Sequence, residues 1–115
     1  MRRVYIAHPY GGRAENREAA TRFFMRAAEL GYEPVAPWLI VTGHWDESRR
    51  AEGMAINLNA VRACDELWLC GPEITPGMLD EAVAFAQTHV FARDNARQFR
   101  TLADLDGLAR QGVNP

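Results

Sequence analysis

The sequence predicts an α/β fold: a three-layer, flavodoxin-like or Rossmann-like parallel sheet of four to five strands with helices on both faces. Short apolar runs alternate along the chain with longer segments in which apolar residues recur every three or four positions. Gly and Pro residues follow several of the apolar runs, as expected where a strand ends. The run Leu67-Trp68-Leu69-Cys70 is apolar throughout, which is typical of a buried strand in a parallel sheet. Strands separated by helices then join through right-handed crossovers.

The same signals place the elements along the chain. Strands are expected over Arg3 to Ala7, Glu33 to Val41, Cys64 to Cys70 and Val90 to Ala92. Helices are expected from about Ala14 to Leu30, from Ser48 to about Ala63, after Thr75, and from Thr101 to near Gly112. Gly31 ends the first helix, Ser48 caps the second, and Thr101 with Asp104 forms a capping pair for the last. The second strand contains two prolines, and a polar loop over Thr42 to Glu47 follows it.

Composition limits the classes of function. The 115 residues, 48% of them hydrophobic, suffice for one domain with its own core, over residues 1–115. The net charge of −2 gives no electrostatic footprint for duplex nucleic acid or an anionic membrane. No apolar run approaches the roughly 20 residues that cross a bilayer, and the start of the chain does not resemble a signal peptide. We therefore expect a cytoplasmic protein.

Metal and cofactor chemistry is not indicated by the sequence. Cys64 and Cys70 lie near one strand without Cys or His partners at zinc spacing, which predicts buried thiols rather than a disulfide or a metal site. The chain has neither a Walker lysine nor a GxGxxG motif, which disfavours ATP and NAD. We expect no metal and no cofactor.

The helix after the third strand carries the acidic residue of greatest interest. Thr75 suits its N-cap and Pro76 its first position, so the helix start offers free N–H donors and a positive dipole end to an anion. At about 100° per residue, Asp80 falls opposite the apolar face and Glu81 at its edge. Asp80 is expected in solvent and Glu81 half-buried, where its proton affinity is open to tuning. Alternatively, Glu81 only complements the helix dipole.

Two loops are expected to meet at the carboxyl edge of the sheet, where strand order reverses and open α/β sheets bind ligands. One loop runs from His8 to Gly12 and the other from Gly71 to Gly77. The glycines that end the first loop let its backbone approach a ligand closely, and Arg13 or Arg17 can hold a phosphate. The alternative is that the first loop is an ordinary tight turn.

Several short motifs occur in order along the chain: Val4-Tyr5-Ile6-Ala7-His8-Pro9-Tyr10-Gly11-Gly12, Asn16, Gly31 with Pro37, Cys64-Asp65, and Thr75-x-Gly77-Met78-x-x-Glu81. As a set they resemble the nucleoside 2-deoxyribosyltransferase-like superfamily over roughly residues 3–90. The chain is most similar to small, uncharacterised bacterial and phage branches, with the nucleoside 5′-monophosphate N-glycosidases as better-understood relatives. The resemblance implies a flavodoxin-like sheet, often dimeric, with Glu81 as nucleophile and Tyr5 near it. We expect the substrate contacts at His8, Pro9, Tyr10, Gly11, Gly12, Arg13, Thr75, Gly77 and Met78.

These residue types suit glycosidic chemistry. Breaking an N-glycosidic bond passes through an oxocarbenium-like state at C1′, which a carboxylate stabilises or traps as an ester. Water then releases the sugar, whereas the transferase branch passes it to a second base. Relatives that accept a 5′-phosphate place a hydroxyl residue where the transferases carry an acid, so Thr75 favours a monophosphate. Capping alone also explains Thr75.

One position departs from the better-known enzymes of the superfamily. They carry an Asp that handles the leaving base in the helix before the third strand, and the matching residue here is Asn57. An amide cannot transfer a proton as a general acid or base does, although it can hydrogen-bond a base. Either the acid role falls to Asp46, in the loop after the second strand, or standard hydrolysis is absent.

We therefore expect a nucleotide-binding N-glycosidase that cleaves the N-glycosidic bond of a nucleoside 5′-monophosphate or a related ribosyl compound. Its catalytic residues are expected to be Glu81, Tyr5, Asp46 and Asn57. The alternatives are a non-catalytic nucleotide-binding or sensing module on the same scaffold, and a nucleoside deoxyribosyltransferase. The expected partners are a small nucleotide or nucleoside and further copies of the chain, in a homodimer or higher homo-oligomer.

Overall fold

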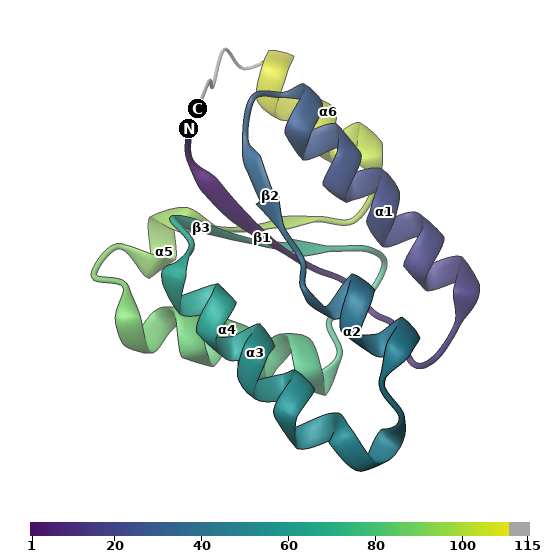
Figure 1. The fold of residues 1–115 in the computed structure, drawn as a ribbon. Helices are drawn as coiled ribbons and strands as arrows, with labels where there is room; N and C mark the ends of the chain where they lie inside the picture. The colour runs from purple at the N-terminus through teal and green to yellow at the C-terminus, as the bar shows by residue number, and fades with distance from the viewer. Residues whose placement is uncertain (111–115) are drawn as a thin grey trace.

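The protein has an α/β fold around an all-parallel sheet (Figure 1). The computed structural model describes residues 1–110, apart from the side chains of residues 42, 43, 109 and 110. Four strands form the described sheet: β1 (Arg3–Ala7), β2 (Glu33–Val35), β3 (Glu66–Cys70) and β4 (Ala96–Phe99). Their order is β2-β1-β3-β4, and all neighbours are parallel. The predicted fold class is confirmed.

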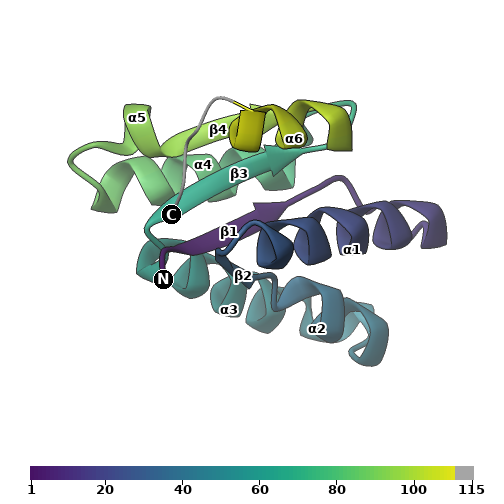
Figure 2. The same ribbon diagram turned by 90° about the horizontal axis from the view of Figure 1, so that it is seen from above.

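Helices cover both faces of the sheet (Figure 2). On one face, α1 (Ala14–Glu29) packs beside α6 (Leu102–Arg110). On the other, α3 (Arg50–Ala63) packs beside α4 (Pro76–Thr88). Two shorter helices, α2 (Trp38–His44) and α5 (Ala92–Asn95), and a 3₁₀ turn, η1 (Glu47–Arg49), lie in the connections. No described helix is long and apolar enough to cross a membrane.

The segment predicted as a strand over residues 33–41 forms a short strand followed by a helix. The strand stops at Val35, and Trp38–His44 is a helix that also takes in part of the predicted polar loop. Pro37 fixes φ at −59°, which suits the start of a helix. The indole N–H of Trp38 donates to the Ile6 carbonyl at 2.9 Å, so the helix is anchored across the end of β1.

The fourth strand was also misplaced by sequence reasoning. Val90 is 93% exposed and lies between α4 and α5, and the strand runs over Ala96–Phe99 instead. This edge strand reads Ala-Arg-Gln-Phe and buries only Phe99, whose ring meets Trp68 edge-on at 5.1 Å. A short polar strand at the edge of a sheet lacks the apolar run by which a strand is recognised in a sequence.

Local signals elsewhere agree with the structure, with one exception. The first strand and helix lie where the sequence predicts, and Gly31 follows α1 with φ +94°. Thr101 and Asp104 exchange capping hydrogen bonds at 3.2 Å, while the predicted helix end near Gly112 lies outside the described residues. Ser48 does not cap α3, because it sits within the 3₁₀ turn and donates its own N–H to Asp46.

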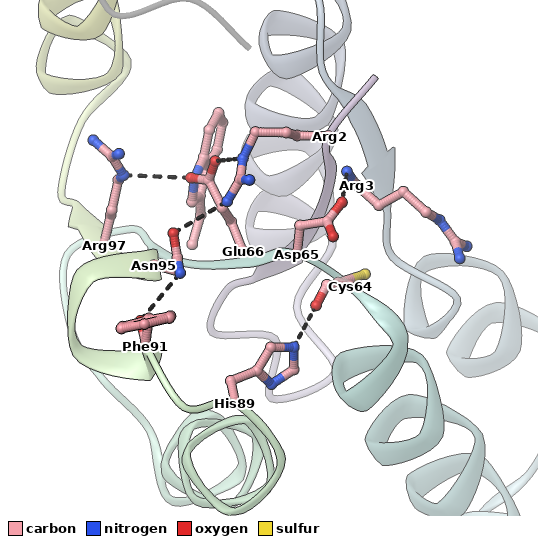
Figure 3. A network of polar contacts seen from close by, with 10 residues as sticks. Arg2, Arg3, Cys64, Asp65, Glu66, His89, Phe91, Asn95 and Arg97 are labelled. Atoms are coloured by element: carbon pink, nitrogen blue, oxygen red, sulfur yellow. Dashed lines mark hydrogen bonds and ion pairs between the residues drawn. The ribbon is translucent and has the colours of Figure 1, made fainter.

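A buried carboxylate ties the N-terminal edge of the sheet together (Figure 3). Glu66, at the start of β3, is 2% exposed and lies 2.7 Å from Arg2 Nε and 3.3 Å from Arg97 Nε. The indole N–H of Trp68 donates at 3.0 Å to Glu66 Oε1, the oxygen that also faces Arg97, while Arg2 faces Oε2. Beside it, Asp65 accepts from the Arg3 amide at 2.8 Å. These contacts join β1, β3 and β4 at the edge away from the strands' carboxyl ends, so their role is structural.

Candidate functional site

The reversal of strand order lies between β1 and β3, which bracket the centre of the sheet. Ala7 pairs with Leu69 in register, so the loops that leave these strands start side by side. Gly71, with φ +99°, lies so close to the first loop that a Cβ there would sit 2.8 Å from His8 Nε2 and 3.1 Å from Pro9 Cδ. The two loops therefore meet at the switch point, where open α/β sheets bind ligands.

Two adjoining hollows form a cleft at this edge. The smaller, of about 390 Å³, contains Glu81 and is lined by His8, Tyr10, Gly11, Trp38, Arg50, Met54, Asn57, Thr75, Pro76, Gly77, Met78 and Glu81. The larger, of about 620 Å³, is lined by Tyr10, Gly11, Gly12, Val41, Trp45, Asp46, Glu47, Arg49, Arg50, Gly53, Met54 and Asn57. The two hollows share a wall, because five residues line both: Tyr10, Gly11, Arg50, Met54 and Asn57. Together the hollows have room for a small ligand made of two or three linked chemical groups.

Glu81 is the buried acid of the smaller hollow. It is 8% exposed and so more deeply buried than the half-buried position expected from the sequence, whereas its neighbour Asp80 lies in solvent, as the helix rotation predicts. Burial raises the pKa of the Glu81 carboxyl to about 7, the Tyr5 hydroxyl lowers it, and the charge of Asp80 raises it. A carboxyl in this state is partly protonated at neutral pH, so small changes in its surroundings control its charge.

Tyr5 lies beneath Glu81 on β1 and is fully buried. Burial, then the nearby Glu81 charge, raises the pKa of its phenol. Among the residues that the structure describes, the Tyr5 hydroxyl has no hydrogen-bond partner of ordinary geometry. Because the Tyr5 hydroxyl lowers the pKa of the Glu81 carboxyl, Tyr5 is placed to favour the ionised form of that carboxyl.

The start of α4 faces the same hollow. Thr75 is the N-cap and accepts from the Met78 amide at 3.3 Å, while the Thr75 amide donates to the Met78 sulfur at 3.5 Å. Pro76 follows, as the sequence predicts, and Gly77 occupies the second helical position. An amide at that position has no acceptor within its own helix. Leu79 and Val83 are exposed, so α4 buries a narrower face than its apolar residues suggest.

The first loop contributes backbone and one imidazole. His8 is buried, its Nδ1–H donates to the Pro9 carbonyl at 2.7 Å, and burial lowers the pKa of the ring. Its Nε2 is thus left as an acceptor. Gly11 and Gly12 have φ of +56° and +74°. No atom outside the adjacent residues lies within 4 Å of the position that a Cβ would take at either residue, so their backbone is open to the cleft. Arg13 is exposed, pairs with Glu15 at 3.0 Å and lines neither hollow.

Asn57 and Asp46 lie differently with respect to Glu81. Asn57 lines both hollows, and its buried Oδ1 has no hydrogen-bond partner among the described residues. Asp46 lines only the larger hollow, and its Oδ1 accepts from the amide of Ser48 at 3.1 Å and from its hydroxyl. The structure therefore places Asn57 between the hollows and Asp46 away from the one that holds Glu81.

The cleft contains residues that the sequence reasoning did not single out. Arg50 and Met54 line both hollows, and Trp38 lines the smaller one. Arg50, Met54 and Asn57 are spaced four and three residues apart, which puts them on one face of α3. That spacing was available in the sequence, but only the tertiary structure shows that this face borders the cleft.

The chain belongs to the family described as domain of unknown function DUF7768, whose model matches residues 2–94. The match runs from the start of β1 through most of α5 and therefore includes every residue that lines the two hollows. No curated protein matches the chain.

Proposed function

We propose that this member of the DUF7768 family hydrolyses the N-glycosidic bond of a nucleoside 5′-monophosphate or a related ribosyl compound, with Glu81 as the nucleophile. The observation that carries the proposal is the buried Glu81 carboxyl in a cleft at the switch point, in a hollow that it shares with the N-terminal turn of α4. The resemblance to the nucleoside 2-deoxyribosyltransferase-like superfamily supports the same role for Glu81.

The environment of Glu81 fits attack at an anomeric carbon. As the base departs, positive charge develops on the sugar, and that charge favours the carboxylate over the carboxylic acid. The pKa of about 7 means that the free protein holds Glu81 close to the point at which a bound cation-like sugar ionises it. Tyr5 beneath it stabilises the same ionised form. Water then releases the sugar from the glycosyl ester.

The N-terminus of α4 supports a phosphate on the substrate. The Gly77 amide and the Thr75 hydroxyl lie at the positive end of the helix dipole in the hollow that holds Glu81. Arg50, on α3, lines this hollow. Its guanidinium forms an ion pair with Glu47 at 2.6 Å, and both side chains are exposed. An exposed ion pair is weak, so Arg50 is free to turn to a phosphate, and its guanidinium suits one.

The second candidate is a nucleotide-binding or sensing module without catalysis. Asn57 favours it, because an amide takes the place at which the better-known enzymes carry an acid. Both candidates use the same cleft, so binding alone does not separate them.

Release of free base separates the two candidates. The protein is incubated with a panel of nucleoside monophosphates, and free base is measured by chromatography. We expect the wild type to release base and Glu81→Gln to lose at least about 100-fold in rate as expected for a missing nucleophile. Asp80→Asn removes only the smallest of the influences on the pKa of Glu81, so we expect its rate to stay within about tenfold of the wild type. Asp80→Asn is the matched control because it removes the neighbouring, exposed carboxylate. Equal rates for wild type and Glu81→Gln contradict the proposal, and tight binding without release by either supports the sensor.

The phosphate preference is tested with a monophosphate and its parent nucleoside. We expect the monophosphate to bind more tightly, with most of the difference lost in Arg50→Gln. Tighter binding of the nucleoside contradicts the placement of the phosphate at α4.

A further inference from the structure

We propose that the preferred substrates are ribosyl 5′-monophosphates whose base carries a positive charge through its glycosidic nitrogen, such as a pyridinium, and therefore leaves as a neutral molecule without being protonated. This inference rests on the proposed function and names the substrate class of the same site.

A neutral base leaves as an anion unless an acid protonates it. The acid must have a proton to give and must reach the base when the base lies beside the sugar. If the sugar lies over Glu81 in the smaller hollow and the phosphate at α4, the space left for the base is the larger hollow, and the glycosidic nitrogen would lie near the wall that the hollows share. Of the described residues that line both, Asn57 is the one whose side chain has a buried, unsatisfied polar atom, and it is an amide.

The other titratable groups of the described cleft are poorly suited to act as this acid. A carboxylate that attacks C1′, as Glu81 does, cannot donate a proton in the same step. His8 carries its proton on Nδ1, where it is held by the Pro9 carbonyl, and its Nε2 accepts. Asp46 and Glu47 lie outside the hollow of Glu81; Asp46 accepts hydrogen bonds from Ser48, and Glu47 pairs with Arg50 at 2.6 Å. Tyr10 lines both hollows, but its ring packs against Trp38, with the ring centres 5.9 Å apart.

The remaining cations, Arg49 and Arg50, keep their protons under all working conditions. Arg49 has a different relevance: its guanidinium lies 3.6 Å from the centre of the Trp45 ring. Both residues line the larger hollow. The wall of this hollow thus already stacks a flat cation on an aromatic face, and a pyridinium is also a flat cation. The carboxylates of Asp46 and Glu47 border the same space.

The reaction balances without an acid. A bond forms between a Glu81 carboxylate oxygen and C1′ while the C1′–N bond breaks, and the electron pair of the broken bond neutralises the cationic base. Water then adds to C1′, the ester bond breaks with its electron pair returning to Glu81, and the proton of the water passes to solvent. The only co-reactant is water.

The test compares nicotinamide mononucleotide, whose base is a pyridinium cation, with its reduced form and with cytidine 5′-monophosphate, whose bases are neutral six-membered rings. We expect kcat/KM of the wild type for the cationic substrate to exceed that for either neutral one by at least about 100-fold, because a general acid contributes about 10²- to 10⁴-fold. In Asn57→Asp, which supplies a carboxyl at the shared wall, we expect this ratio to fall at least about tenfold.

The outcomes separate this inference from the proposed function. Cleavage of the neutral nucleotides at rates equal to or above that of the cationic one overturns the substrate class while Glu81 hydrolysis stands. An unchanged ratio in folded Asn57→Asp overturns the argument from the missing acid. Absence of cleavage of all three by the wild type overturns the proposed function, and this inference with it.

Discussion

Replacing Glu81 by glutamine tests the burial of this carboxyl without reference to any substrate. The variant keeps the size of the side chain and one of its two oxygens, replaces the other oxygen by an NH2 group, and removes the titration. In the folded protein, burial raises the pKa of Glu81 from 4.5 to about 7. The native state therefore holds a proton over a pH range in which the unfolded chain has already lost it.

The direction and size of the expected pH dependence of stability follow from this difference in pKa between the folded and unfolded states. The free energy of unfolding that the proton contributes is fully present below about pH 4.5 and is lost as pH rises to about 7. Each unit of pKa corresponds to about 1.4 kcal/mol, so the wild type loses about 3 kcal/mol over this range relative to Glu81→Gln. That is a large part of the stability of a typical small domain.

The measurement is urea unfolding of wild type and Glu81→Gln at several pH values between 4 and 8. Other titrating groups act equally on both proteins, so the difference between their unfolding free energies isolates Glu81. We expect Glu81→Gln to gain about 3 kcal/mol relative to wild type between pH 4 and pH 8, and the Asp80→Asn control to show little change. If the difference in unfolding free energy between the two proteins stays constant with pH, or shifts in favour of the wild type at high pH, the raised pKa of the buried Glu81 carboxyl is refuted.

Three further substitutions test other features. Tyr5→Phe removes the group that lowers the pKa of Glu81, so we expect this pKa to rise and base release at pH 6 to fall, by up to about tenfold for one pKa unit. A pH–rate profile whose midpoint does not shift to higher pH contradicts this expectation. Gly71→Ala adds a Cβ against His8 at φ +99° and should cost about 1–3 kcal/mol in thermal unfolding, more than Gly12→Ala, where φ is also positive but the space is open. Glu66→Gln leaves two partly solvated arginines without their buried partner and should cost about 2–3 kcal/mol in urea, whereas Glu33→Gln, at an exposed ion pair, should cost less than about 1 kcal/mol.

The sequence by itself determined the elements whose signals are local. The apolar runs of β1 and β3, the spacing of α1, and the Thr75-Pro76 start of α4 each depend on residues a few positions apart, and each lies where it was predicted. Helical rotation also separated Glu81 from Asp80 correctly, because the two differ by a fixed angle about one axis.

Only the tertiary structure decided the features that depend on distant partners. Trp38–His44 became a helix anchored on the Ile6 carbonyl, and the polar segment Ala96–Phe99 became a strand because the edge of β3 was open to it. Arg50 reached the cleft because α3 packs beside α4. The raised pKa of Glu81 likewise comes from its burial in the folded chain. A side chain's solvation depends on everything packed around it, and that information is not contained in any short stretch of sequence.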